Sequence, residues 1–125
     1  MPYSTQQKLT LAGVIMRAER PLTAAEICRA GRKAVHTLGI ATVYRTLKKL
    51  VGEGRVRLVG IPGISPRYES TASQHHHFFF CRRCRRLYNL PGCARGLDAL
   101  APEGFAVDRH EIVLYGRCAD CRGKA

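Results

Sequence analysis

Two Cys-x-x-Cys pairs contain the side chains of this chain that are best suited to metal chemistry. The first pair is Cys81 and Cys84, and the second is Cys118 and Cys121. Each pair directs two thiolates toward one point, and two such pairs together form a closed tetrahedral zinc site. Because four thiolates leave no open coordination position, we expect this zinc to stabilise the fold rather than to catalyse a reaction.

A second group of metal-binding side chains lies before and between these pairs. It comprises His75, His76, His77, Cys93 and His110. On a strand, His75 and His77 point to the same side and can reach one ion, whereas His76 points away. The group suggests a second metal site. We expect its metal to be exchangeable, whereas the zinc of the first site is permanent.

Charge and composition narrow the class of protein. The 125 residues include 21 Lys and Arg against 9 Asp and Glu, which gives a formal net charge of +12. Such an excess favours a nucleic-acid partner, although a solvated, arginine-rich surface is the other reading. No apolar run approaches the roughly 20 residues of a membrane span, and residues 1–7 do not resemble a signal peptide. We therefore expect a cytoplasmic protein with no membrane partner, whose paired cysteines bind zinc rather than form disulfides.

The elements that must position these residues fall into two predicted domains, residues 1–72 and residues 73–125, on either side of a polar stretch. In the first domain a helix ends before Pro21, and Thr23 and Glu26 form a capping box that opens a second helix toward Gly31. A third helix covers residues 41–53, and a basic hairpin has strands at residues 55–59 and 67–69. Helices followed by such a hairpin are typical of a winged helix-turn-helix.

The third predicted helix has two different faces. The stripe expected to be buried consists of Val43, Leu47, Leu50 and Val51. The opposite face carries cations and hydroxyls that can enter a major groove, where Arg and Tyr reach bases and Lys reaches phosphates. The predicted DNA-binding residues of the helix and hairpin are Thr42, Tyr44, Arg45, Lys48, Lys49, Arg55 and Arg57. A merely solvated charged face is the alternative.

The second predicted domain is a small α/β unit. Strands are expected at residues 76–80 and 87–90, around the first cysteine pair. A short helix over residues 93–100 would place Cys93, Leu97 and Leu100 on its apolar side. A long strand over residues 105–115 would lead to the second pair. We expect a unit this thin to need its metal in order to fold.

Three features together resemble the ferric uptake regulator family, including its zinc-sensing branch. They are the Ala-Thr-Val-Tyr-Arg-Thr-Leu run at residues 41–47, three histidines before the first cysteine pair, and His110 before the second. The resemblance covers about residues 23–122. It implies an α+β protein with an N-terminal winged helix-turn-helix and a C-terminal α/β dimerisation domain. It also implies a homodimeric, metal-dependent repressor that binds a palindromic operator in double-stranded DNA, with residues 105–115 as the expected dimer edge.

The resemblance also implies ligand sets. The four paired cysteines match the family's structural zinc site. The family's regulatory site uses the positions of His75, His77 and His110 together with a carboxylate 17 residues before the last histidine, and here that carboxylate is replaced by Cys93. A thiolate favours Zn²⁺ over Fe²⁺ as the regulatory metal, with Fe²⁺ as the alternative. Cys93 could instead be a small core residue, as we expect for Cys28.

Many family members carry a further metal site near the hinge between the domains. The corresponding positions here hold Pro21, Glu69, His76 and Phe78, so two of its four ligands are missing. We expect this degenerate site to be lost, or rebuilt from Glu69 and His76 with His36 as a substitute. A solvated loop histidine is the other reading of His36.

These features favour a zinc-responsive repressor of metal-homeostasis genes. Iron-, heme- or peroxide-responsive regulators of the same family are alternatives. A constitutive zinc-ribbon module would explain the cysteine pairs and the charge, but not the helix at residues 41–53. A zinc hydrolase needs a general base beside a metal-bound water, and Glu111 should point away from the His110 side of its strand. We therefore expect no enzymatic activity.

Overall fold

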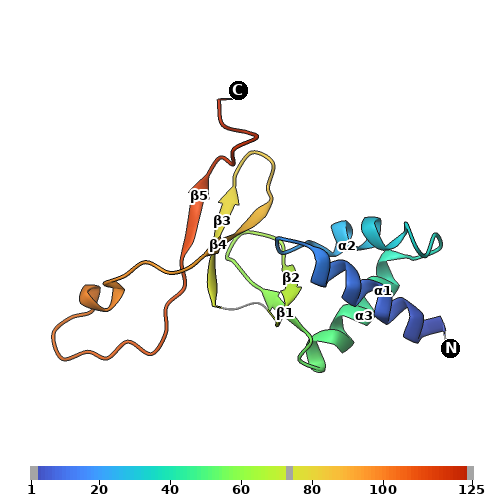
Figure 1. Cartoon of the computed structure of the whole chain (residues 1–125), viewed down its shortest axis with the longest axis horizontal. Helices are drawn as coiled ribbons and strands as arrows, with labels where there is room; N and C mark the ends of the chain where they lie inside the picture. Colours follow the sequence, from blue (N-terminus) through green and yellow to red (C-terminus); the bar gives the residue numbers. More distant parts are fainter. Residues whose placement is uncertain (1–2, 73–74, 124–125) are drawn as a thin grey trace. The chain divides into compact units, whose positions relative to one another are not determined.

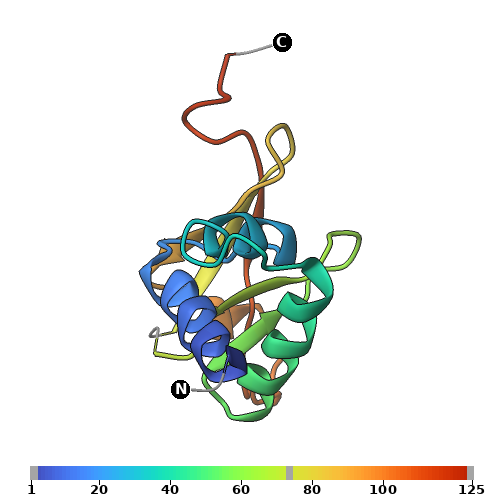
Figure 2. The same cartoon turned by 90° about the vertical axis from the view of Figure 1, so that its right-hand side faces the viewer.

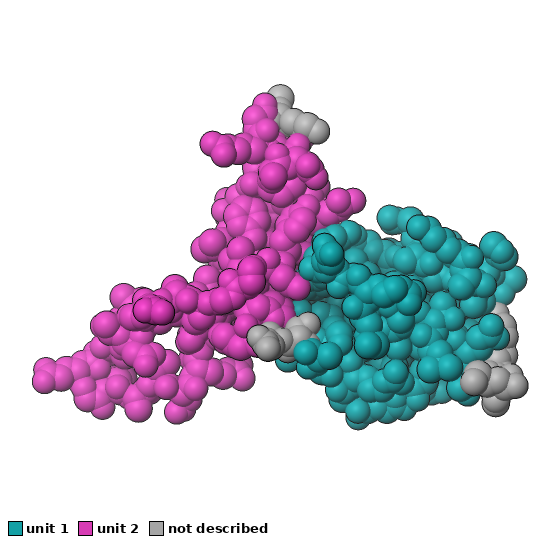
Figure 3. Space-filling model, in the orientation of Figure 1, with its two compact units in different colours: residues 1–74 teal, residues 75–125 magenta. Residues whose placement is uncertain are grey.

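The computed structural model describes residues 3–72 and 75–123, which form two compact units, Met1–Gln74 and His75–Ala125 (Figures 1 and 3). Three helices and a hairpin make up unit 1, and a three-stranded sheet forms the centre of unit 2. The chain therefore has the α+β class that its sequence predicts. None of the described helices combines the length and the apolar composition that a membrane span requires.

Unit 1 contains the helices and the hairpin in the predicted order. Its helices are α1 (Tyr3–Arg17), α2 (Ala24–Gly31) and α3 (Ile40–Gly52). Strands β1 (Val56–Val59) and β2 (Arg67–Ser70) pair antiparallel and form a separate two-stranded sheet. These predicted elements are confirmed, with small differences at their ends. Figure 2 shows the helices and this hairpin from a second side.

The predicted capping box at the start of α2 is also confirmed. The hydroxyl of Thr23 accepts a hydrogen bond of 3.1 Å from the backbone N–H of Glu26. The carboxylate of Glu26 accepts a return bond of 3.0 Å from the backbone N–H of Thr23. Two backbone donors that the helix cannot satisfy are thus paired, which fixes where α2 begins.

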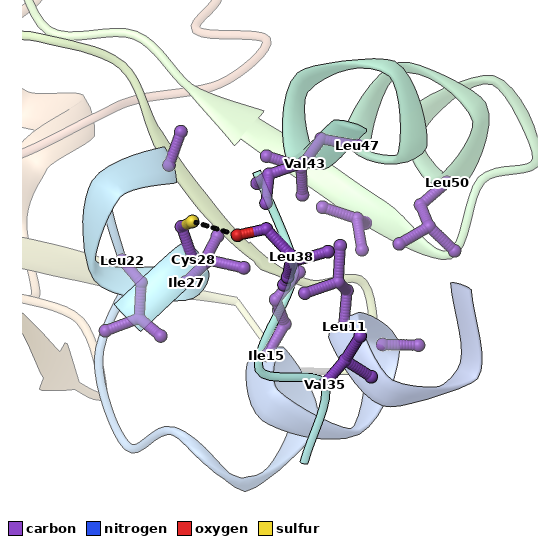
Figure 4. Packing of buried hydrophobic residues seen from close by; sticks show 13 residues of the cluster. Leu11, Ile15, Leu22, Ile27, Cys28, Val35, Leu38, Val43, Leu47 and Leu50 are labelled. Atoms are coloured by element: carbon purple, nitrogen blue, oxygen red, sulfur yellow. Dashed lines mark hydrogen bonds between the residues drawn. The ribbon is translucent and has the colours of Figure 1, made fainter. Parts of the chain in front are cut away.

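One hydrophobic core holds the three helices of unit 1 together (Figure 4). Leu11, Ile27 and Leu47 are fully buried in it, and Cys28 is buried there as predicted. The stripe of α3 is buried at Val43, Leu47 and Leu50, but the predicted burial of Val51 is wrong, because its side chain is 38% exposed. Val51 lies in the last turn of α3, and Thr46 is the further residue that the helix buries.

Unit 2 is built on a sheet with the strand order β4-β3-β5. The central strand β3 (His76–Cys81) pairs antiparallel with β4 (Leu87–Pro91) and parallel with β5 (Val113–Gly116). In the parallel pair Phe78 lies opposite Val113, and Cys81 lies opposite Gly116. Residues just before β5 therefore lie beside the start of β3, and residues just after β5 lie beside its end. This register positions both groups of metal-binding side chains.

The predicted helix over residues 93–100 is wrong. Only Leu97–Leu100 form a single 3-10 turn, η1, and Cys93 lies before it in irregular backbone. Gly92 and Gly96 both have positive φ, so the chain turns twice where a helix would need regular geometry. Leu100, expected on a buried side, is 82% exposed.

The predicted strand over residues 105–115 is much shorter than expected. Only Val113–Gly116 form strand β5, and residues 105–112 belong to no strand and follow a loop that leads back to β5 (Figure 1). The carbonyl of Ile112 still accepts a bond of 3.0 Å from the N–H of Phe78. Farther back from Ile112 the chain passes beyond the start of β3, so it has no neighbouring strand with which to pair.

Candidate metal centres

The four paired cysteines converge at one end of the sheet in unit 2. Their four sulfur atoms lie within 4.8 Å of one another. The Sγ atoms of Cys84 and Cys118 are 3.9 Å apart, close to the sulfur separation of about 3.8 Å in a tetrahedral site with Zn–S bonds of roughly 2.3 Å. All six cysteines of the chain are free thiols. The donor type and the spacing therefore fit a zinc ion held by Cys81, Cys84, Cys118 and Cys121.

The parallel pairing of β3 and β5 brings the two cysteine pairs together. Cys81 ends β3, and the second pair begins two residues after β5 ends at Gly116. A hydrogen bond of 2.8 Å from the N–H of Arg82 to the carbonyl of Gly116 fixes the two segments at this point. The backbone N–H groups of Cys84 and Cys118 lie 3.5 and 3.3 Å from the sulfur of Cys81 and donate to it.

The same contacts explain how this site favours a thiolate. Burial alone would raise the pKa of the Cys81 thiol, but the backbone donors of Cys118, Cys84 and Arg83 outweigh it and lower this pKa to about 6. Burial, with hydrogen bonds that the Cys121 thiol donates to the sulfur atoms of Cys118, Cys81 and Cys84, raises the pKa of Cys121 to about 12. A metal-free cluster therefore holds some of its protons, and a metal ion would have to displace them.

A side chain that the sequence did not single out belongs to this cluster. The hydroxyl of Tyr88 on β4 lies 3.9 Å from the sulfur of Cys84. A hydrogen bond to Cys118, together with burial and Cys84, raises the pKa of Tyr88 to about 12, and the same hydroxyl lowers the pKa of Cys118. Nothing in the spacing of the cysteines points to Tyr88; its alternation within β4 is the signal that could have found it.

The second cluster lies at the other end of β3. His75, His77, Cys93 and His110 present nitrogen and sulfur atoms that all lie within 4.8 Å of one another. Nε2 of His77 is 3.1 Å from Nε2 of His75 and 3.3 Å from Sγ of Cys93. Sγ of Cys93 is 2.8 Å from Nε2 of His110. Three imidazoles and one thiolate form a donor set that suits Zn²⁺.

Three separate segments supply these four side chains. His75 and His77 lie at the start of β3, Cys93 follows β4, and His110 precedes β5. His77 is the most deeply buried of the four, with 4% of its surface exposed, while Cys93 and His75 are exposed. Burial, reinforced by the charges of His75, His110 and His76, lowers the pKa of His77, so this imidazole is neutral and able to bind a metal.

A backbone group just before β5 orients His77. The N–H of Ile112 donates a hydrogen bond of 3.2 Å to Nδ1 of His77. A neutral imidazole that accepts at Nδ1 carries its proton on Nε2, the atom that faces Cys93 and His75. In this tautomer His77 is a hydrogen-bond donor toward Cys93 and His75. To bind a metal through Nε2, the His77 ring must carry its proton on Nδ1 instead. Nδ1 can then no longer accept the hydrogen bond from the N–H of Ile112.

The residues of the degenerate hinge site do not belong to either cluster. Within residues 3–72 and 75–123, the two clusters above are the only groups of three or more His, Cys, Asp or Glu side chains spaced to share an ion. Glu69 is buried in unit 1 and forms an ion pair of 3.0 Å with Arg57. His36 is exposed in the turn before α3, and the ring of His76 packs against Phe78 in unit 2.

The predicted DNA-binding residues lie on the exposed side of unit 1. Tyr44 on α3 is 55% exposed, and Arg45 donates a hydrogen bond of 3.0 Å to the hydroxyl of Thr42, which is half-buried. Arg57 on β1 remains about half exposed although it pairs with Glu69. The remaining predicted residues, Lys48, Lys49 and Arg55, are exposed. The polar side of α3 therefore carries an unburied aromatic ring and several cations.

Family and sequence comparisons both relate this chain to ferric uptake regulators. The sequence model of the Ferric uptake regulator family matches residues 3–115. Transcriptional regulator FurA of Mycobacterium tuberculosis (strain ATCC 25618 / H37Rv) is 34% identical over 94 residues, which are 72% of this chain and 63% of that protein. The match thus spans slightly less than two thirds of that relative's length.

Solved structures show the same fold. A zinc-bound manganese uptake regulator superposes with a TM-score of 0.77 at 23% identity, over 90% of this chain and 88% of that one. A zinc uptake regulator complexed with zinc and DNA is 25% identical, with a TM-score of 0.56, over 92% of this chain and 80% of the other. This chain thus combines the fold of these regulators with a four-cysteine cluster and a cluster of three histidines and one cysteine.

Proposed function

The chain belongs to the ferric uptake regulator family, and we propose that it is a transcriptional repressor that binds operator DNA when zinc is present. In this proposal residues 1–72 are a winged-helix DNA-binding domain. Residues 73–125 bind the metal and dimerise. The four paired cysteines hold a structural zinc ion, and His75, His77, Cys93 and His110 hold the regulatory one.

The observation that carries the proposal is the convergence of three imidazoles and one thiolate from three chain segments. Such a set of nitrogen and sulfur donors favours Zn²⁺ over Fe²⁺, which prefers sites with more oxygen ligands. When bound, a zinc ion supplies a crosslink between the start of β3, the segment at Cys93 and the segment at His110. The exposed thiol of Cys93 is free to approach or leave the two imidazoles that it contacts. Because Cys93 lies outside any helix, its segment can reorganise at small cost.

The DNA-binding part of the proposal rests on unit 1. Helix α3 follows α2 after the connection at residues 32–39 and exposes Tyr44, Arg45, Lys48 and Lys49 on one side. Such a helix suits the major groove, and the β1–β2 hairpin suits the adjacent backbone. The zinc uptake regulator that is 25% identical to this chain was solved in complex with zinc and DNA. An operator with two-fold symmetry would match a homodimer.

Dimerisation is proposed through unit 2. Five large apolar side chains between Leu100 and Tyr115 are exposed in the single chain. They are Leu100, Phe105, Val107, Leu114 and Tyr115. β5 is an edge strand in the order β4-β3-β5, so its outer side can pair with another chain. Exposed apolar side chains that gather in one segment of the chain support an interaction surface there.

The site geometry gives no reason to propose an enzyme. A hydrolytic zinc site keeps an open coordination position beside a general base. Here both clusters supply four protein donors each. Glu111 is exposed and pairs with Arg109 at 3.2 Å.

Zinc-dependent DNA binding can be tested without knowing the operator. Duplexes are first selected from a random library with zinc-loaded protein, and their affinity is then measured by gel shift with zinc-loaded and zinc-depleted protein. We expect zinc at the second site to tighten binding of the selected duplex, since an effector shifts an equilibrium only by binding one state better. Metal analysis must show that the four-cysteine site stays loaded in both samples. Equal affinities after verified loading would exclude the proposed switch.

A further inference from the structure

The two turns that carry the cysteine pairs expose a cluster of arginines whose role is not explained by the metal. Residues 81–86 and 117–122 contain six arginines and a single acidic residue, Asp120. We call these six the knuckle arginines: Arg82, Arg83, Arg85, Arg86, Arg117 and Arg122. All six are exposed. We propose that they form a second nucleic-acid contact of this protein, which binds the phosphate backbone of duplex DNA without reading its sequence.

The two turns lie at the same end of unit 2, which brings the arginines of both turns to that end. The N–H of Arg82 bonds the carbonyl of Gly116, and the sulfur atoms of Cys84 and Cys118 are 3.9 Å apart. In Figure 1 the turn after β3 and the chain after β5 run to the same end of the sheet. Charges from both turns therefore act on one partner.

Charge balance shows that the arginines exceed what the metal needs. Four thiolates around one Zn²⁺ carry a net charge of about −2. Six guanidinium groups and one carboxylate leave a positive surplus even after that charge is neutralised. A clustered positive surplus on one face is the electrostatic signature of nucleic-acid binding.

Two of the arginines are held in place by aromatic rings. The guanidinium carbon of Arg82 lies 5.2 Å from the ring centroid of Tyr115, and that of Arg85 lies 5.4 Å from the ring of Phe80. Such contacts restrict a long side chain before it meets a ligand, so less conformational entropy is lost on binding. A guanidinium that stacks on a ring still presents its N–H edge to a phosphate.

The backbone at Arg85 is the second independent observation. Arg85 has φ = 61°, and it is the one residue other than glycine with positive φ in the part of the chain that the structure describes. Glycine adopts this conformation without strain, whereas a residue with Cβ does so at a cost. The unfavourable backbone at Arg85 supports a role for its side chain.

The chemistry of the surface favours DNA over an acidic protein. Protein interfaces have an apolar or aromatic centre, whereas DNA interfaces are polar and strongly positive. Within residues 81–86 and 117–122 the exposed residues beside the arginines are Cys84, Ala119 and Asp120, none of which is a large apolar side chain. The nearby aromatic rings of Tyr115 and Phe80 lie under Arg82 and Arg85. Arginine forks also match phosphate oxygens in a bidentate arrangement.

The test uses zinc-loaded, full-length protein and a random-sequence duplex in a series of NaCl concentrations. The double variant Arg85→Gly/Arg122→Gln removes one knuckle charge from each turn and relieves the positive φ. Arg95→Gln/Arg109→Gln removes two exposed charges of the same unit outside the turns and serves as the control. We expect the knuckle variant alone to have a shallower dependence of log K on log [NaCl], by about 0.9 for each phosphate that the variant no longer neutralises.

Further measurements separate this contact from the alternatives. Equal salt slopes for the knuckle variant, the control and the parent, at equal zinc content, would overturn the proposal. Loss of zinc from the knuckle variant would also overturn it, because the arginines would then serve the metal site. If the knuckle variant loses affinity for poly-glutamate but not for DNA, the partner is an acidic protein instead.

A final arm distinguishes this contact from operator binding by α3. In a background with Arg45→Gln, Lys48→Gln and Lys49→Gln, the residual affinity for the random duplex must fall further when the knuckle variant is added. No further fall would exclude a second contact. Operator binding that does not depend on zinc would contradict the proposed function but would leave the difference in salt slope unchanged.

Discussion

The sulfur of Cys93 lies 2.8 Å from Nε2 of His110, although the two residues are 17 positions apart in the chain. Cys93 also lies 3.3 Å from Nε2 of His77, so it contacts histidines from two different segments. A cysteine kept only for packing would be surrounded by apolar side chains and buried. Cys93 is exposed and surrounded by imidazoles, which supports its role as a metal ligand.

We expect the substitution Cys93→Ala to lower the zinc content from two ions per chain to one. Loss of a direct ligand should weaken the site by at least the 10- to 100-fold that loss of a supporting residue costs, or roughly 1.4–2.8 kcal/mol. Metal analysis after gel filtration measures the content. Cys28→Ala, which removes a thiol from the core of unit 1, is the control and should keep both ions. Two ions retained by the Cys93 variant would show that Cys93 is not a ligand.

The tautomer of His77 should reverse when the second site is loaded. In the metal-free cluster the N–H of Ile112 donates to Nδ1, which places the ring proton on Nε2. Zinc bound at Nε2 requires the proton on Nδ1, so the Ile112 amide loses its acceptor. Long-range ¹H–¹⁵N correlation spectra report the tautomer, and the Ile112 amide resonance should shift on loading. An unchanged Nε2–H signal in verified zinc-loaded protein would mean that His77 does not bind through this atom.

Removal of all zinc should unfold unit 2 while unit 1 stays folded. Among residues 75–123 the buried hydrophobic residues are few, namely Phe80, Cys81, Leu87 and Cys121, and two of them are zinc ligands in the proposal. The core of unit 1 contains no metal-binding cluster among the described residues. Binding free energies of about 10–16 kcal/mol for structural zinc are also folding free energies. Hydrogen exchange with a strong chelator should therefore deprotect β3 and β4 but not α3; protected β3 amides in metal-free protein would contradict this.

The substitution Glu26→Ala should destabilise unit 1 by about 1 kcal/mol, because it removes half of the capping box. Burial would raise the pKa of Glu26, but hydrogen bonds from Arg20 and Thr23 outweigh it and hold this pKa below 4.5. A lowered native pKa means that the ionised carboxylate stabilises the fold at neutral pH. This contribution is lost as the pH falls through the native pKa.

Urea unfolding of the parent and of Glu26→Gln at neutral and acidic pH tests that sign. The difference between the two should shrink as the pH falls, because the protonated carboxyl and the amide are then both uncharged. Glu103→Gln, which changes an exposed residue of unit 2, is the control and should behave as the parent at both pH values. A difference that grows at acidic pH would contradict the assignment.

The substitution Arg45→Gln should weaken binding of the selected operator duplex by about 1–3 kcal/mol and relax its sequence preference at one base pair. The hydrogen bond of 3.0 Å to Thr42 holds the guanidinium on the exposed side of α3. Arg29→Gln removes an exposed charge from α2 and is the matched control. Gel shifts with zinc-loaded protein measure both. A uniform loss of affinity for all duplexes would assign Arg45 to phosphate contact instead.

The sequence by itself determined the features that depend on near neighbours. Three features depend only on residues that are close in sequence: the capping box of Thr23 and Glu26, the buried stripe of α3, and the paired cysteines. They could be predicted because capping hydrogen bonds and side-chain periodicity act over a turn or two of the chain. The residues of both metal-binding groups could likewise be named from type and spacing together with a family resemblance.

Tertiary structure alone decided how distant segments meet. The parallel pairing of β3 with β5 brings His110 beside His77 and brings the two cysteine pairs together, and no local pattern specifies that register. The expected helix at residues 93–100 and strand at residues 105–112 failed for the same reason. The local sequence of each segment favours a regular helix or strand, but neither segment has a neighbouring surface or strand that would stabilise it. The backbone around Cys93 is therefore irregular, and this irregular path brings Cys93 to the histidines.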